Sequence, residues 1–267
     1  MAIDGVKIID SDSAYDVYNP IMEKYHFGAS IEEIQKEIDA FESDFTFSEL
    51  HHEIFTTAYA LAMWEIGALS DSQLKKVREI VKKGASDLWD EVASDAKKDR
   101  QKILVKFLKK IEKPNPKVKK RKNYRMRTDF IFSPGDVLVF QFPSKAFGAT
   151  VLIDTYQEGR TLYYAFAELV LDATVVNINE KPTLEDVTWF SKTHARFNIG
   201  FDSNKTVSHN KLLTFKSKFE KIGTVEIKSN FRRIGSMSGS VYTFDEFCDD
   251  WCVRKGKIKN LHELLEC

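Results

Sequence analysis

Hydrophobic residues near the start of the chain recur every three to four positions, which is the spacing of an amphipathic helix. In the segment 50–69 they wrap most of a helix, a pattern typical of a helix that is buried by its neighbours. Two further stripes cover 74–92 and 103–111, the second with lysines on the opposite face. Residues 1–112 are therefore predicted to form a small helical bundle.

Short polar motifs predict where some of these helices begin and end. Ser30 with Glu33, and Thr46 with Glu49, have the S/T-x-x-E spacing of a capping box, in which the two side chains bind each other's backbone amides. Gly84 is a point at which the helix predicted over 74–92 can be interrupted.

The helical pattern ends at the segment 113–127, KPNPKVKKRKNYRMR. Pro114 and Pro116 stop a helix because they lack the amide hydrogen and clash with the preceding turn. No apolar period survives in this segment, so we predict a basic linker over 113–127 that separates two domains.

After this segment the apolar period changes from 3.6 to 2, which is the period of a strand. In DVLVFQF, Leu138 and Phe140 face one way, and Val137 and Val139 face the other, so the strand is expected to be covered on both sides. The strands that follow are separated by short turns, which favours an antiparallel meander. Residues 128–267 are predicted to form an antiparallel sheet-rich α+β domain, as a strongly bent sheet or small barrel-like domain with short helices.

Later segments alternate between strand and helix patterns. HARFNIGF and FEKIGTVEI read as strands, and a short helix is expected after Thr183. The T-x-x-E motif from Thr243 to Glu246 predicts a further short helix. The segment 257–266, KIKNLHELLE, is expected to form a terminal helix.

Four phrases of the second half together resemble a known family: SPGDVLVFQFPSKAFGATVLID, YYAFAEL, TLEDV and FEKIGTVEI. They are similar to bacterial polymorphic-toxin immunity proteins of the immunity protein 26 type, over roughly residues 130–250. The resemblance implies a sheet-rich α+β fold. It also implies a cytoplasmic protein that binds a cognate secreted toxin and neutralises it by occlusion, with no catalysis of its own. The family provides no catalytic residues to carry over, and the helical segment 1–112 lies outside the match.

Charge is strongly segregated although the net charge is zero. Residues 1–95 hold 20 acidic and 8 basic residues, whereas residues 96–127 hold 15 basic and 2 acidic ones. Such segregation indicates electrostatic contact with a partner or between segments of the chain. The acidic helices could mimic nucleic acid toward a basic nuclease toxin, or simply form a polar surface.

The turn after the second predicted strand carries candidate residues for binding a protein partner. An exposed loop with acids, an aromatic residue and an arginine suits a protein interface. The candidate partner-binding residues are Asp154, Tyr156, Glu158 and Arg160. The alternative is a plain polar hairpin tip.

The basic tract is a candidate for binding nucleic acid or an acidic partner, because lysine and arginine neutralise phosphates. Its bases are Lys117, Lys119, Lys120, Arg121, Lys122, Arg125 and Arg127. Tyr124 is positioned to stack on a base. The alternatives are an extended solvated linker or a segment that lies against the acidic helices. A regulatory nucleic-acid-binding protein is therefore kept as the alternative to an immunity protein.

Other chemistry finds little support in the sequence, and no metal or cofactor is predicted. Four residues of types that can bind zinc occur near the end of the sequence: Cys248, Cys252, His262 and Cys267. Their spacing matches no standard zinc finger. His51 and His52 are adjacent on a helix and so point to different sides. The opening glycine, aspartate and hydrophobic residues of the first strand resemble those of endoribonuclease toxins. The segment that leads into the second strand lacks the basic, proline-containing sequence expected of such an enzyme.

The compartment is expected to be the cytoplasm. No apolar run approaches the roughly 20 residues of a membrane-spanning helix, so no membrane association is predicted. The start of the sequence does not have the pattern of a signal peptide, and the three cysteines do not form a disulfide framework.

Overall fold

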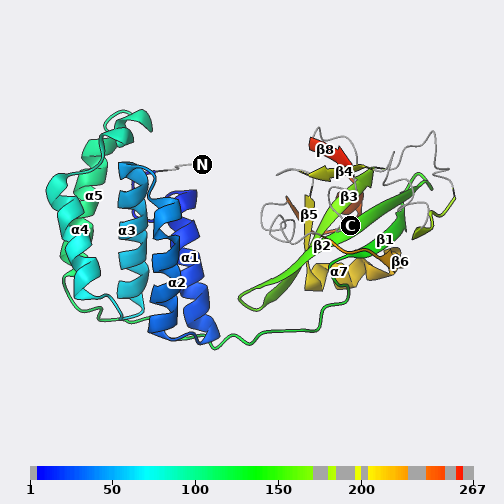
Figure 1. The fold of residues 1–267 in the computed structure, drawn as a ribbon, viewed down its shortest axis with the longest axis horizontal. Coiled ribbons are helices and arrows are strands. Elements are labelled where there is room, and N and C mark those ends of the chain that lie inside the picture. The colour runs from blue at the N-terminus through cyan, green and yellow to red at the C-terminus, as the bar shows by residue number, and fades with distance from the viewer. Residues whose placement is uncertain are drawn as a thin grey trace. The chain divides into compact units, whose positions relative to one another are not determined.

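The computed structural model describes residues 5–170, 180–184, 196–199, 204–227, 239–249 and 257–260. The chain divides into two compact units, residues 1–125 and residues 126–267. Figure 1 shows helices in the first unit and a sheet with short helices in the second. The α+β class predicted from the sequence is thereby confirmed. Among the described residues no helix is long and apolar enough to cross a membrane.

The first unit is a bundle in which α3 lies between α1 and α2 on one side and α4 and α5 on the other (Figure 1). Its helices are α1 Asp12–Phe27, α2 Ile31–Phe45, α3 Glu49–Glu65, α4 Asp71–Lys83 and α5 Ala96–Ile111, with a 3₁₀ turn η1 at Asp87–Glu91. Helix α3 is buried on nearly all sides, as the density of its apolar residues predicted.

Helix ends follow local hydrogen-bonding chemistry, with one correction. Ser30 and Glu33 form the predicted capping box at the start of α2. The predicted box from Thr46 to Glu49 is wrong. Helix α2 continues to Phe45, so the Thr46 amide donates to Glu42 and closes that helix. Ser48 begins α3 instead, and its hydroxyl accepts from the His51 amide. Helix α4 ends at Gly84, whose φ of 97° is in the left-handed region.

The second unit is built on one sheet with short helices. Its strands are β1 Asp136–Gln141, β2 Phe147–Glu158, β3 Thr161–Val170, β4 Arg196–Ile199, β5 Asn204–Ser208, β6 Glu220–Thr224, β7 Gly239–Val241 and β8 Lys257–Asn260. Its helices are α7 His209–Phe215 and α8 Phe244–Cys248, with a 3₁₀ turn η2 at Lys216–Lys218. The strand order is β6-β1-β2-β3-β4-β8, and β5 pairs with both β3 and β7.

The sheet corrects two expectations about topology. It is not closed, because β6 and β8 lie at opposite ends of the strand order, so the barrel-like alternative is not supported. It is also mixed, because β5 and β7 run parallel while the other pairs are antiparallel. The terminal helix expected over 257–266 is wrong for residues 257–260, which form β8 and pair with β4. Residues 261–266 lie outside the described residues.

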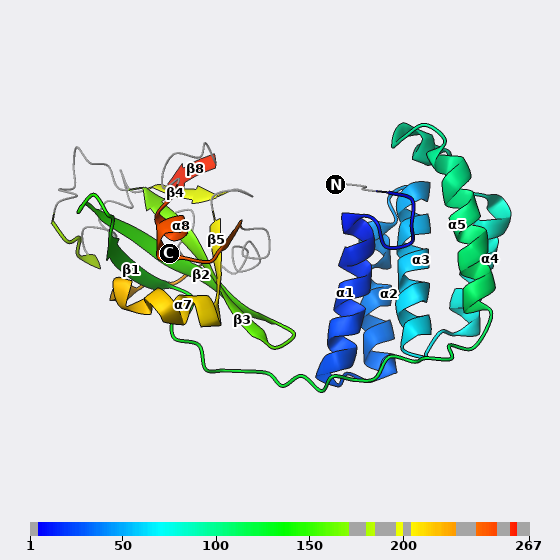
Figure 2. The same ribbon diagram turned by 180° about the vertical axis from the view of Figure 1, so that it is seen from behind.

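Strand β1 is covered on both faces, as its sequence predicted. Val137 and Val139 belong to one apolar cluster of the sheet, which also contains Ala165 of β3. Leu138 and Phe140 belong to a second cluster, formed with residues of α7 and α8. Figure 2 shows α8 in front of this second face. The second cluster is rich in phenylalanine: Phe140, Phe166, Phe215, Phe219 and Phe247.

Candidate functional site

Three of the four predicted partner-binding residues lie on one face of the β2–β3 hairpin. In the register of these strands, Asp154 pairs with Ala165, Tyr156 with Tyr163, and Glu158 with Thr161. Residues two apart on a strand point to the same face. Asp154, Tyr156 and Glu158 therefore share a face, whereas Arg160 lies in the turn between the strands and is exposed.

Two tyrosines that the sequence analysis missed extend this face. Tyr163 stacks on Tyr156 with ring centroids 5.2 Å apart and an interplanar angle of 15°. Tyr242 follows β7 and is 57% exposed. It lies close enough to Tyr163 to affect the pKa of that phenol. We call Tyr156, Tyr163 and Tyr242, with Asp154 and Glu158, the tyrosine face.

Burial and nearby carboxylates raise the pKa values of Tyr156 and Tyr163 on the tyrosine face. Burial raises the pKa of Tyr156 to about 12, and the charges of Glu158 and Asp154 add to this effect, while a hydrogen bond with Thr206 opposes it. The pKa of Tyr163 is also raised, chiefly by burial and then by Glu158. Both phenols are therefore neutral hydrogen-bonding groups beside carboxylates, which suits binding better than proton transfer.

The basic tract lies mostly against the helical bundle. Residues up to Arg125 belong to the first unit, and this segment crosses the C-terminal ends of α3 and α1. The Lys119 amide donates to the Glu65 carbonyl and the Tyr124 amide donates to the His26 carbonyl, each at 2.8 Å. The Arg121 guanidinium donates to the carbonyls of Gly28 and Ala29 at 3.0 and 2.9 Å. We call residues 113–125 the strap.

The strap places cations where helix ends need them, because the last carbonyls of a helix lack partners and carry partial negative charge. The Lys119 ammonium also binds the Glu65 carboxylate at 2.7 Å and donates to the Tyr18 hydroxyl at 2.7 Å. Lys119 and Arg121 are thus engaged within the unit although they are exposed, as are Lys117, Lys120, Lys122 and Arg125. Arg127 belongs to the second unit and pairs with Asp129. Nucleic-acid binding by the whole tract stays a prediction.

The docking of the strap is expected to depend on pH through His26. This side chain is 7% exposed, and its Nδ1 atom lies 3.3 Å from the Lys122 amide, which donates to it. Its pKa is lowered from 6.5, first by burial and then by the charges of Lys122 and Lys119. Docking is therefore fully favourable above pH 6.5 and weakens as the pH falls from there through the lowered pKa.

Amide hydrogen exchange of residues 119–125, corrected for intrinsic rates, should measure the weakening of strap docking at low pH. We expect protection to fall severalfold between about pH 7.5 and pH 5, because docking then requires a neutral imidazole. In the variant His26→Gln the pH dependence should disappear. Equal protection of the wild-type strap at both pH values would contradict the assignment.

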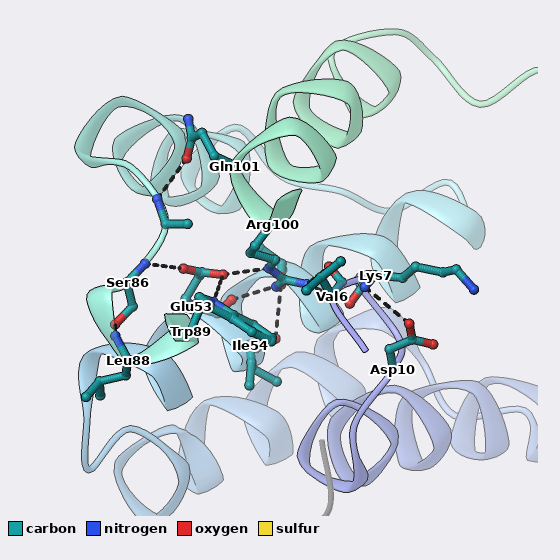
Figure 3. A network of polar contacts seen from close by, with 12 residues as sticks. Val6, Lys7, Asp10, Glu53, Ile54, Ser86, Leu88, Trp89, Arg100 and Gln101 are labelled. Carbon is teal, nitrogen blue, oxygen red and sulfur yellow. Dashed lines mark hydrogen bonds and ion pairs between the residues drawn. The ribbon is translucent and has the colours of Figure 1, made fainter. Parts of the chain in front are cut away.

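A second polar constellation, at the centre of the bundle, was not found from the sequence (Figure 3). Arg100 and Glu53 form an ion pair with Nε and Oε1 2.7 Å apart, and their side chains are 1% and 4% exposed. The Glu53 carboxylate also accepts from the Trp89 indole and the Ser86 amide, each at 3.0 Å. The remaining Arg100 nitrogens donate to the carbonyls of Val6 and Lys7 and to the Thr57 hydroxyl.

This network is arranged to hold the bundle together. Both carboxylate oxygens and all three guanidinium nitrogens have protein partners, which come from α3, η1, α5 and the segment before α1. A cavity of about 490 Å³ opens beside Glu53, and two lysines in its wall are already paired, Lys83 with Glu49 and Lys97 with Asp87. The network thus fixes helix positions, and we do not assign it a reaction.

The remaining candidate residues do not assemble into a metal site within the segments that the structure describes. The His51 ring packs against Phe47 at a tilt of 34°, and its Nδ1 lies 2.7 Å from the Ser48 hydroxyl. Burial raises the pKa of the Cys248 thiol to about 11, so this cysteine is a poor nucleophile at neutral pH. Cys252, His262 and Cys267 lie outside the described residues.

The G-D motif that opens the sheet is used for structure. Asp136 is 3% exposed and forms an ion pair with Lys221 of β6 at 2.6 Å. Its carboxylate also accepts from the Ser133 amide at 3.0 Å. These contacts fasten β1 to β6 and to the turn that precedes β1.

Comparison of the chain with models of protein families, with curated proteins and with solved structures finds no match in any of the three.

Proposed function

We propose that this chain is an immunity protein that binds a cognate protein toxin through the tyrosine face and blocks the toxin by occlusion. The observation that carries the proposal is the stacked pair Tyr156–Tyr163 with the exposed Tyr242 beside it, flanked by Asp154 and Glu158. The resemblance of residues 130–250 to immunity proteins supports the same function.

Tyrosine suits a binding surface for a physical reason. Its ring buries a large apolar area, its hydroxyl forms hydrogen bonds, and only two torsions are immobilised on binding. Stacking already holds Tyr156 against Tyr163, so little further entropy is lost when a partner covers them. The two carboxylates would attract a partner with a basic surface and accelerate its association.

The proposal predicts that a toxin domain is encoded beside this chain's gene, and that domain is the partner for the test. We expect the wild-type protein to protect bacteria that express this toxin and to bind the purified toxin domain. Tyr156→Ala should weaken binding about 30-fold or more, which corresponds to the roughly 2 kcal/mol of an interface hot spot. Calorimetry on the folded variants would measure the change.

A matched control is Tyr15→Ala, which removes a tyrosine that is 46% exposed on α1 of the first unit. This variant should bind the toxin as the wild type does. Equal weakening by the two substitutions, or full affinity of Tyr156→Ala, would contradict the tyrosine face as the binding surface. Absence of protection by the wild-type protein would contradict the immunity function itself.

A further inference from the structure

The helical bundle separates its charges between opposite sides. Helices α1 and α2 contain nine acidic and two basic residues, whereas α4 and α5 contain twelve basic and three acidic ones. Figure 1 shows these two pairs of helices on opposite sides of α3. The strongly basic side of the unit is therefore a helical surface, which meets the strap only at Lys113.

On α5 most of the exposed bases form one row, which Lys113 continues just after the helix ends. Lysines at spacings of three or four residues lie on one helix face. The row consists of Lys98, Lys102, Lys106, Lys109 and Lys113, all exposed. It extends about 22 Å along the helix, at roughly 1.5 Å per residue. We call it the lysine row.

The two acidic residues that border the lysine row are already paired. Glu112 binds Arg78 of α4 at 2.9 Å, and Asp99 binds Lys102 at 2.7 Å. Glu112 is thus paired outside the row, whereas Asp99 offsets the charge of Lys102, and the row keeps a net positive charge from its other four lysines. Opposite it, Leu104, Phe107 and Ile111 are buried in the bundle core, which holds the helix in place.

We infer that the lysine row binds the phosphate backbone of double-stranded DNA without sequence preference. About six phosphates of one strand lie along roughly 22 Å of duplex, so each ammonium group has one within reach. This inference does not depend on the proposed function, since it rests on a different unit of the chain.

The structure favours a duplex over other anionic partners. A helix that lies on a membrane needs an apolar face for the lipid, and the apolar face of α5 is used by the core. Binding of single strands relies on aromatic side chains that stack on bases, and the row's exposed apolar residue is Val105. A protein interface of high affinity needs a buried apolar centre, which one valine does not supply.

Fluorescence anisotropy of a labelled DNA duplex of about 24 base pairs tests the inference on the full chain. If all five lysines contact phosphates, log K should fall with log salt at a slope of about −4.5, or roughly 500-fold between 50 and 200 mM NaCl. The variant in which all five lysines are changed to glutamine should lose measurable binding. Lys102→Gln with Lys106→Gln should reduce the slope by about 1.8.

A control with the same change of charge replaces five exposed lysines outside both the lysine row and the basic tract by glutamine: Lys7, Lys36, Lys145, Lys211 and Lys216. It should retain the wild-type slope, and circular dichroism should show every variant folded. An equal loss in this control, or no binding by the wild type at about 50 mM NaCl, would overturn the inference. Binding of anionic phosphatidylserine vesicles as strong as the binding of DNA would also overturn it. So would a wild-type chain that self-associates through the row and does not bind DNA.

Discussion

Replacing Arg100 by methionine should lower the free energy of unfolding of the helical unit by about 3–5 kcal/mol. The substitution keeps a long side chain but leaves the Glu53 carboxylate, whose side chain is 4% exposed, as a buried charge without its counterion. It also removes the donor that binds the carbonyls of Val6 and Lys7 at 3.0 and 2.6 Å. The segment before α1 should therefore exchange its amide hydrogens faster.

Urea unfolding of the full chain, with hydrogen exchange read separately on peptides from α3 and α5, would measure this loss. The matched control is Lys102→Met, close to Arg100 in the sequence of α5, which breaks an exposed ion pair with Asp99. Exposed pairs contribute at most about 1 kcal/mol, so the control should be close to wild type.

The double variant Glu53→Met with Arg100→Met distinguishes a lost charge pair from general damage. With both charges removed, no uncompensated ion remains buried, so the double variant should be more stable than Arg100→Met alone. A double variant that loses the sum of the two single effects would contradict the assignment of the network as a paired charge. So would an Arg100→Met chain within about 1 kcal/mol of wild type.

Features of the fold that depend on residues close together in the sequence were predictable from it. The alternation in β1 assigns Val137 and Leu138 to opposite faces, because the strand geometry itself sets this period. The burial of α3 follows in the same way from the density of its apolar residues. The position of a helix start was less determined, because Thr46 and Ser48 are both capping residues and the length of α2 decides between them.

Features that depend on contacts between residues far apart in the sequence were not predictable. An apolar pattern shows which face of a strand is buried, but not which strand lies beside it. The parallel pairing of β5 with β7 and the open sheet therefore had no local signal. The same limit applies to the tyrosine face. Asp154, Tyr156 and Glu158 were found from one loop, whereas Tyr242 joins them through the β5–β7 pairing.

Replacing Gly135 by alanine should be the most damaging single change in the sheet unit, with a loss of at least about 3 kcal/mol. Gly135 has a φ of 93°, a conformation that side-chain-bearing residues rarely adopt. An added Cβ would lie 2.1 Å from the Val225 carbonyl oxygen. Neither backbone can withdraw easily, because the Val225 amide donates to the Gly135 carbonyl at 2.9 Å and the Gly135 amide donates to the Leu152 carbonyl at 2.7 Å.

We expect β6 to separate from β1. Hydrogen exchange of the peptide that contains residues 220–224 would measure this separation. Gly28→Ala is a control with nearly the same φ, 97°, but with no contact within 4 Å of the added Cβ. It should cost only the conformational strain, about 1–2 kcal/mol in the helical unit. If the two substitutions cost the same, the contact with Val225 does not constrain the sheet. A larger cost for Gly135→Ala, with β6 exposed and β2–β3 still protected, would show that this glycine allows the close approach on which the edge of the sheet is built.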